Sequence, residues 1–308
     1  MALSKKKIYV IGCTMWDIVG KPLEPMWQGK DSNGLIIERL GGVALNIALG
    51  LSKILDKSSY ELNLVSVIGK NNKTRKIQAI LKKNNIHTKY MIIKGNLTDQ
   101  YLSIETKHGE IFGSINSSNT FLSNQSDIIK NISSICSAHK KENENAVLIF
   151  DGNCTKELLD YVKTATREEI FTKYFIPANF SKLTDFKNEI FYFKGFNLIV
   201  NLNEANILMG SKHLRNSEDA AKAIFKKIKS EKCLAIVTDG PNTVCGVTNG
   251  EVEILRPKVI RSNASRSGAG DAFFAYFLSY KELNPGVSLK KNLRVAIQKT
   301  LKYLQTND

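Results

Sequence analysis

The clearest candidate for a chemical role in the sequence is a run of small residues that ends in an acid, Ser267-Gly-Ala-Gly-Asp271. The apolar run Ala272–Leu278 follows it directly, which indicates that a helix begins here. Small residues let a ligand approach the backbone, and the free N–H groups of a first helical turn attract anions. Such a turn could stabilise a phosphoryl group in transfer. We expect the helix dipole to keep Asp271 ionised, so that it can accept a hydroxyl proton. The same residues also fit a plain tight turn with an acidic helix start.

A second glycine-rich corner, Gly41-Gly42-Val-Ala-Leu-Asn46, precedes another apolar helical pattern. The paired glycines again allow close approach of a ligand. Asn46 lies in the first turns of the expected helix, where its amide could bind a sugar hydroxyl. The alternative is an ordinary strand-to-helix turn with a surface asparagine.

Two polar motifs follow apolar runs that have the length of strands. Asn201-Leu-Asn-Glu204 comes after Leu198–Val200, and Thr238-Asp-Gly240 comes after Ile236-Val237. Ligands of open α/β sheets bind where parallel strands end, so these residues could contact a nucleotide. Glu204 could hold Mg²⁺ through water, because Mg²⁺ keeps much of its hydration shell. The alternatives are a helix N-cap with an acidic first turn and an ordinary turn.

The elements that must position these motifs alternate along the chain. Expected strands are Lys7–Ile11, Leu62–Ile68, Ala146–Asp151, Lys173–Ile176, Leu198–Leu202 and Leu234–Thr238. Expected helices lie at 42–55, 73–84, 125–138, 155–164, 217–230, 269–282 and 289–304. Apolar strands that alternate with amphipathic helices predict an α/β fold, with a central mostly parallel sheet and helices on both faces. We expect one domain over residues 1–308.

Two segments, about 14–40 and 97–116, break this alternation. Both contain strand-like pieces with polar alternation, and the second has a turn at His108-Gly109. We expect them to form one small antiparallel sheet that projects from the main domain. Such a sheet could act as a lid that excludes water from a reaction.

Composition narrows the class of protein. The chain has 308 residues and is 43% hydrophobic, which is enough for a sizeable core. No stretch approaches the ~20 apolar residues of a membrane-spanning helix. Its five scattered cysteines favour a reducing cytoplasm over a disulfide framework or zinc site. The net charge of +15 could attract ATP or RNA, but the lysines are dispersed, so we expect a solvated surface and no nucleic-acid partner.

Taken together and in this order, the motifs resemble the ribokinase-like (PfkB) family of carbohydrate and nucleoside kinases. The resemblance spans nearly the whole chain and includes Asp17 after the first strand. It implies that Asp271 is the catalytic base and that Gly268, Ala269 and Gly270 form the anion hole. It further implies that Asn201 and Glu204 organise phosphate and Mg²⁺, that Thr238 and Gly240 contact the nucleotide, and that Asp17, Gly41, Gly42 and Asn46 hold the acceptor.

Within this family the closest resemblance is to the pseudouridine kinases. It is carried by Asp31-Ser-Asn-Gly34, Thr98-Asp-Gln-Tyr-Leu-Ser103, Ile115-Asn-Ser-Ser-Asn119 and Asp151-Gly-Asn153. The implied reaction transfers phosphate from ATP with Mg²⁺ to pseudouridine. Ser32, Asn33, Thr98 and Asn116 would then line the acceptor site, although such residues are also common in turns. The sequence departs from the family pattern at Ser265–Ser267, Thr243 and Ile176, and none of these changes removes the base or the anion hole.

Three alternatives remain at this point. The acceptor could be another nucleoside or a sugar, such as adenosine, ribose or fructose. The chain could instead be a non-catalytic nucleotide- or RNA-binding protein. We leave a monovalent cation open as a further cofactor, and we expect that a homodimer could form through the lid, because an exposed sheet edge can pair with a second copy.

Overall fold

The computed structural model describes residues 5–106, 111–167, 169–178, 180–210, 213–228, 230, 232–258 and 268–306. Its main sheet has the strand order β14-β13-β12-β11-β10-β9-β1-β4-β5, with β6 also paired to β4. Their bounds are β1 (Lys6–Ile11), β4 (Tyr60–Ile68), β5 (Ile86–His87), β6 (Met91–Ile93), β9 (Ala146–Asp151), β10 (Phe171–Ile176), β11 (Asn197–Asn201), β12 (Ala235–Thr238), β13 (Val244–Val247) and β14 (Val252–Leu255). The strands pair in parallel except at β13 and β14, so the predicted mostly parallel sheet is confirmed.

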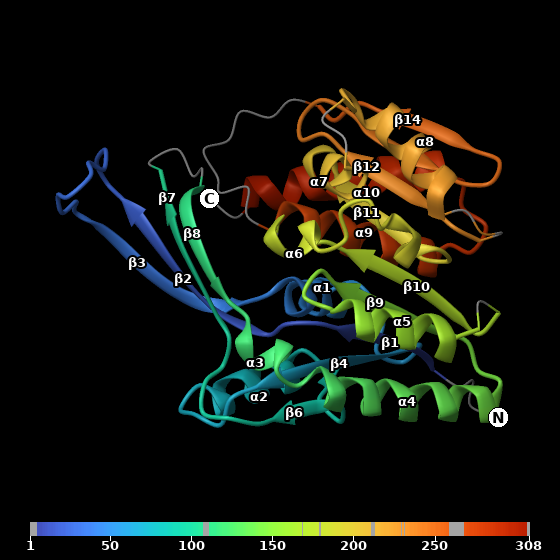
Figure 1. Cartoon of the computed structure of the whole chain (residues 1–308), viewed down its shortest axis with the longest axis horizontal. Coiled ribbons are helices and arrows are strands. Elements are labelled where there is room, and N and C mark those ends of the chain that lie inside the picture. The colour runs from blue at the N-terminus through green and yellow to red at the C-terminus, as the bar shows by residue number, and fades with distance from the viewer. Residues whose placement is uncertain are drawn as a thin grey trace.

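Helices cover both faces of this sheet (Figure 1). On one face lie α1 (Val43–Ser52), α2 (Thr74–Lys83), α9 (Ala269–Leu283) and α10 (Leu289–Thr306). The other face is covered by α3 (Asn119–Leu122), α4 (Gln125–Glu142), α5 (Lys156–Ala165), α6 (Phe180–Thr184), the 3₁₀ helix η1 (Ile190–Phe193), α7 (Leu202–Leu208) and α8 (Ser217–Ile228). Side chains of β1 alternate between the two cores: Tyr9 and Ile11 pack into one, Ile8 and Val10 into the other.

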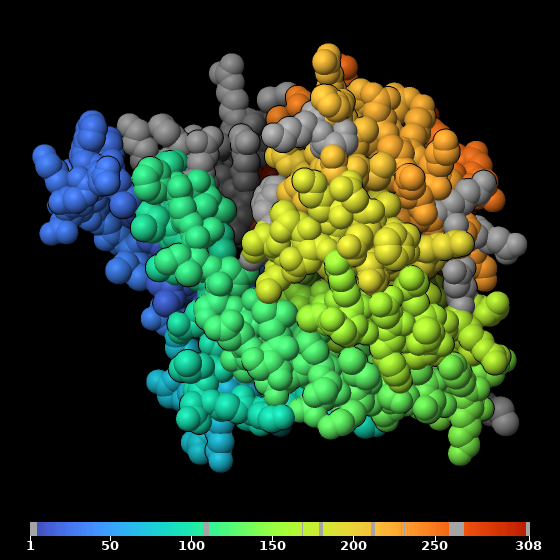
Figure 2. Space-filling model, viewed as in Figure 1, coloured from blue at the N-terminus to red at the C-terminus, as the bar shows by residue number. Residues whose placement is uncertain are grey.

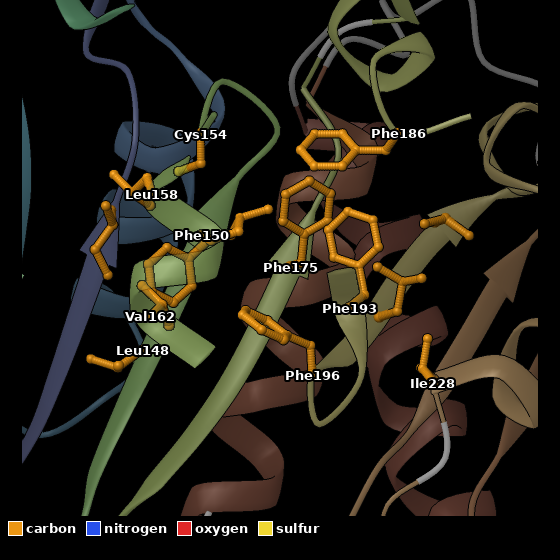
Figure 3. Close-up of a cluster of buried hydrophobic side chains, with 14 of the residues drawn as sticks. Leu148, Phe150, Cys154, Leu158, Val162, Phe175, Phe186, Phe193, Phe196 and Ile228 are labelled. Atoms are coloured by element: carbon orange, nitrogen blue, oxygen red, sulfur yellow. The ribbon is translucent and has the colours of Figure 1, made fainter. Parts of the chain in front are cut away.

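Aromatic side chains fill the core beneath α5 and η1. Phe150 and Phe175 come from neighbouring strands; Phe150 packs edge-on against Phe196, and Phe175 packs against Phe193 (Figure 3). The ring centres of Phe175 and Phe193 lie 4.3 Å apart. This packing fixes β9 and β10, whose carboxyl ends lie at the edge of the sheet where the polar motifs were expected.

A smaller sheet of β2 (Met15–Pro22), β3 (Gly34–Gly41), β7 (Gln100–Glu105) and β8 (Ile111–Ser117) projects from the main body, in the order β3-β2-β7-β8. In the space-filling view it stands beside the rest of the molecule as a separate flap, which we call the lid (Figure 2). The predicted separate sheet is confirmed, but the prediction that it is antiparallel throughout was wrong. Strands β2 and β7 pair in parallel, because both leave the main body and run outward toward the lid tip.

The predicted elements differ from the structure mainly at their ends. Leu202 was expected in a strand but begins α7, since Asn201 caps that helix. The hairpin of β13 and β14 was not predicted, because its strands are only four residues each. In the described part of the chain, no helix is both long and apolar enough to cross a membrane.

Candidate active site

The turn at the start of α9 meets the start of α1, although 225 residues separate them in the chain. Asn46 Nδ2 donates a hydrogen bond to Asp271 Oδ2 at 2.9 Å. The two helices can approach closely because Gly50 faces Ala275, where an added Cβ would lie 2.8 Å away. Two of the expected motifs therefore form one site.

Glycines at the first corner are required by their surroundings. A Cβ at Gly41 would overlap with the carboxylate of Asp17. Gly42 caps α1 with φ +96°, and a Cβ there would lie 2.5 Å from Cys13 O. Asp17 is buried, and Arg39 Nε lies 3.8 Å from its Oδ2. The glycines thus let the lid strand that carries Asp17 lie directly against the start of α1.

Gly268 gives the second corner its shape. It is the N-cap of α9, with φ +79° in the left-handed region. Asp271 follows in the first turn, as predicted, and its side chain is half-buried. Ser265–Ser267 and the turn at His108-Gly109 lie outside the described residues.

Four acids with raised pKa values surround this meeting point. Burial raises the pKa of Asp271 to about 7, and the charges of Asp151 and Asp17 raise it further, while the bond from Asn46 lowers it. Burial also raises the pKa of Asp17 to about 6, that of Asp151 to about 6 and that of Glu204 to about 7. The expected effect of the helix dipole, which favours ionised Asp271, is opposed by desolvation and by the neighbouring carboxylates, which raise its pKa. A pKa near neutrality suits a general base.

Asp151 was not among the predicted site residues. It ends β9, is fully buried, and accepts hydrogen bonds from the N–H groups of Cys13 at 2.8 Å and Asn153 at 2.9 Å. A Cβ at Gly12 would overlap with its carboxylate. An acid that follows an apolar strand and precedes Gly152 was a signal in the sequence that could have placed it here.

The expected nucleotide-side residues lie at the ends of adjacent strands. Asn201 pairs with Thr238 across β11 and β12. Glu204 N–H donates to Asn201 Oδ1 at 2.9 Å and Asn201 N–H donates to Glu204 Oε2 at 2.8 Å, a reciprocal capping box. The N-cap alternative is therefore present, and any nucleotide role comes in addition to it. Gly240 is exposed at φ +50° in the turn between β12 and β13.

The acidic residues fit Mg²⁺ only in a loosely held form. Among the described residues, no cluster of three or more His, Cys, Asp or Glu side chains could hold a metal ion by itself. Mg²⁺ usually binds one or two carboxylates and completes its shell with water and substrate phosphates. Glu204 could supply such a carboxylate, and the charge of Asp271 is near enough to raise its pKa.

The predicted lid residues are not all brought to the site. Thr98 is buried, and its hydroxyl accepts a hydrogen bond from Gly69 N–H at 3.2 Å, so it holds the turn before α2. Ser32 and Asn33 lie at the tip of the β2–β3 hairpin. At ~3.3 Å per strand residue, the tip is on the order of 17 Å from Asp17.

Asn116 is better placed than the tip residues. It pairs with Tyr101 on β7, and Tyr101 pairs with Asp17 on β2, so the three side chains share one face of the lid. The amide oxygen of Asn116 is buried and has no hydrogen-bond partner among the described residues. A buried acceptor of this kind favours a ligand that can donate to it.

Solved structures share this fold over almost the whole chain. Adenosine kinase from Schistosoma mansoni has a TM-score of 0.75 and 17% identity, and covers 98% of this chain and 96% of its own. Ribokinase from Giardia lamblia has a TM-score of 0.73 and 18% identity, with 98% and 91% covered. The nucleoside kinase of Methanocaldococcus jannaschii has a TM-score of 0.70 and 16% identity, with 98% and 93% covered. A search of curated protein sequences found no significant match.

The fold is therefore ribokinase-like. Residues 5–297 match the model of the pfkB family of carbohydrate kinases, and the chain belongs to that family. Members of this family are kinases that transfer a phosphoryl group from ATP to a hydroxyl, so this chain is a sugar or nucleoside kinase.

Proposed function

We propose that this protein phosphorylates the 5′-hydroxyl of pseudouridine with ATP, giving pseudouridine 5′-phosphate and ADP. The observation that carries the catalytic part is the contact between Asn46 and Asp271. This contact supports Asp271 as the base, because Asn46 belongs to the corner that would hold the acceptor. The phosphoryl group would reach Asp271 from the side of Asn201 and Thr238.

In this mechanism the acceptor displaces the amide of Asn46 from part of its contact with Asp271. The carboxylate of Asp271 then takes the proton from the acceptor oxygen as that oxygen bonds to the γ-phosphorus of ATP. The bond from this phosphorus to the bridging oxygen breaks, and ADP leaves. The backbone N–H groups of Gly268, Ala269 and Gly270 would stabilise the charge on the transferred group. Mg²⁺, held near Glu204 through water, would neutralise charge on the ATP phosphates.

Acceptor recognition would fall to Asp17, Gly41, Gly42 and Asn46 for the ribose and to Asn116 for the base. In pseudouridine the ring is attached through carbon, so its N1–H remains as a donor that uridine lacks. The unpartnered amide oxygen of Asn116 could accept from such a donor. A site built to satisfy a buried polar group discriminates strongly against ligands that leave it unsatisfied. Ser32 and Asn33 would take part only if the lid tip of this or a second chain reached the site.

The test is an assay of acceptor-dependent ADP formation. Pseudouridine, uridine, adenosine, ribose and fructose are each offered with Mg-ATP, and pseudouridine should give the highest kcat/KM. Asn116→Ala should lower kcat/KM for pseudouridine roughly tenfold or more and leave ribose nearly unchanged, since ribose has no base to contact. ADP release that is equally fast without acceptor would refute the proposal.

A kinase for another nucleoside or sugar is the second candidate. Adenosine kinase, ribokinase and a nucleoside kinase all share the fold. In that case another acceptor would give the highest kcat/KM, and Asn116→Ala would not lower kcat/KM selectively for pseudouridine. An equal loss for every acceptor would indicate structural damage in the variant. A non-catalytic RNA-binding role is disfavoured by the convergence of Asp271 and Asn46, which RNA binding does not require.

We also propose that two chains pair through their lids. Ile36, Leu102 and Ile115 lie on the lid face opposite Asp17, and all three are exposed. Apolar side chains gathered on one exposed sheet face favour burial against a partner.

The five cysteines are buried and unpaired, which supports a reducing, cytoplasmic location.

A further inference from the structure

Trp16 joins three parts of the molecule at the base of the lid. Its Nε1–H donates to Glu38 Oε2 of β3 at 2.5 Å. The ammonium groups of Lys73 and Lys76 lie 4.5 and 4.9 Å from the centre of its ring. Lys73 Nζ also lies 3.7 Å from Glu38 Oε2. We call these residues the Trp16 clasp; they connect two lid strands to the start of α2 in the main domain.

The contacts of the clasp are of a kind that holds a defined geometry. The side chain of Trp16 is 3% exposed. Lys73 is half-buried, whereas Glu38 and Lys76 are exposed, so the indole is shielded from water and the charges around it are partly solvated. A cation over an aromatic face is attracted by the ring, and Lys73 is the better shielded and the nearer of the two lysines. The carboxylate of Glu38 balances part of the lysine charge and accepts a charge-assisted hydrogen bond. The indole can therefore be held in one orientation relative to α2.

The main-domain side of the clasp is itself fixed. Thr74 Oγ1 donates to Gly69 O at 2.7 Å and accepts from Asn71 N–H at 2.9 Å. A Cβ at Gly69 would overlap with the backbone of Leu97, so this turn lies directly against the chain that leads into β7. Lys73 thus lies in a turn that hydrogen bonds hold in place, so the position of its ammonium group over the Trp16 ring is well defined.

The clasp lies next to Asp17, so a change in the clasp can change how the acceptor binds. Trp16 and Asp17 are consecutive residues of β2, so their side chains point to opposite faces of the lid. Asp17 packs against Gly41 on the side of Asp271 and Asn46. A shift of β2 at Trp16 must move the carboxylate of Asp17 by a similar amount, and a binding group needs placement within ~0.5 Å.

We propose that Trp16 is a positioning residue that sets the place of Asp17 through the clasp and so governs affinity for the acceptor. The inference rests on the proposed role of Asp17 in acceptor binding. The proposal predicts different effects on the acceptor and on ATP. The clasp lies behind the acceptor side, whereas Asn201 and Thr238, on the proposed ATP side, lie on other strands that the clasp does not contact.

Kinetic constants for ATP and for the acceptor, measured separately, test this. Trp16→Phe removes the N–H donor, and Lys73→Met removes the cation while keeping the chain length. Each should raise the acceptor KM roughly three- to tenfold and leave the KM for ATP within about twofold. Glu38→Gln keeps an oxygen that can accept from Trp16 and should be milder than Glu38→Ala. Lys82→Met, which makes the same charge change at an exposed position in the last turn of α2, is the control.

Amide hydrogen exchange supplies a readout that does not need turnover. The clasp variants should exchange faster at the β2 amides from Asp17 to Gly20, whereas Lys82→Met should match the wild type. If the wild type turns over no acceptor, the proposed function fails, and exchange still decides whether the clasp fixes β2. Unchanged exchange in the clasp variants, or an equal rise in both KM values, would overturn the inference.

Discussion

At the scale of single residues, the site is an arrangement of carboxylates that lose part of their acidity through burial. Asp271 has three acidic neighbours within electrostatic reach: Asp17 and Asp151 raise its pKa, and it raises that of Glu204. The amide of Asn46 opposes these effects by donating to the ionised form of Asp271. The pKa of the proposed base, Asp271, is thus set largely by its surroundings.

Replacing the base tests its role directly. Asp271→Asn keeps the shape of the side chain but cannot accept a proton, so kcat should fall roughly 10²- to 10⁴-fold. ATP binding should change little, because the backbone of the turn is unaltered. Steady-state kinetics together with calorimetric titration of ATP separate the two effects. Asp160→Asn, at an exposed acid of α5, should behave as the wild type. Near-normal turnover in Asp271→Asn would exclude the proton-acceptor role.

The raised pKa of Asp271, to about 7, predicts how activity depends on pH. The base works only when deprotonated, so kcat/KM should fall as pH drops below about 7 and level off above it. Asn46→Ala removes the hydrogen bond that lowers this pKa, so the midpoint should move to higher pH. A pH–rate profile of both proteins measures the shift. A midpoint that stays near the ordinary aspartate value would contradict the burial effect described here.

At the scale of elements, two helix starts and one lid strand have to meet. Glycines make this contact possible, because a Cβ would collide with a neighbour at each position: with Asp17 at Gly41, with Cys13 at Gly42 and with Ala275 at Gly50. The parallel strands of the main sheet all end on one side of it, so the polar residues that follow them lie near one another. The packed aromatic rings of the core hold β9 and β10 in register.

Gly42 offers the sharpest test at this scale. Gly42→Ala places a Cβ against Cys13 O and forces a residue with a side chain to adopt φ +96°. We expect a loss of roughly 1–3 kcal/mol in the free energy of unfolding and a marked fall in acceptor affinity, since the corner must shift. Chemical denaturation and acceptor KM are the measurements. Gly113→Ala on β8, where an added Cβ meets open space, should leave both quantities unchanged.

At the scale of the whole molecule, the lid has two unlike faces. One carries Asp17, Tyr101 and Asn116, and the opposite one carries exposed isoleucine and leucine side chains. The first face carries the residues that we propose bind the acceptor. The second has no counterpart within the chain to cover it, as far as the described residues show, and a second lid is a partner of matching character.

Association through this face can be disrupted by charge. Ile36→Lys, at a position that is 80% exposed, should convert a dimer into monomers because a buried lysine without a partner is costly. Light scattering coupled to size-exclusion chromatography gives the mass directly. Leu283→Lys, at an exposed apolar residue at the end of α9, is the control. A wild type that runs as a monomer would rule out pairing through the lid.

Much of the fold was predictable because its signals are local. The apolar run Ala146–Asp151 is a strand with the predicted bounds, and the helix predicted at 269–282 is α9 within one residue. Continuous apolar runs indicate strands buried on both faces, and a change of period marks each helix. The short hairpin of β13 and β14 lacks such a signal, and the parallel pairing of β2 and β7 depends on where each strand leaves the main body.

The sequence by itself determined which residues could take part in binding or catalysis. These are the glycine corners, Asp271, Asn46 and the polar ends of the strands. Only the tertiary structure decided which of them meet. It brought Asn46 to Asp271, added Asp151, gave Thr98 a different partner and left Ser32 and Asn33 at the lid tip. Residue type and spacing report local backbone geometry, whereas distances between remote segments and the desolvation that sets a pKa exist only once the chain is packed.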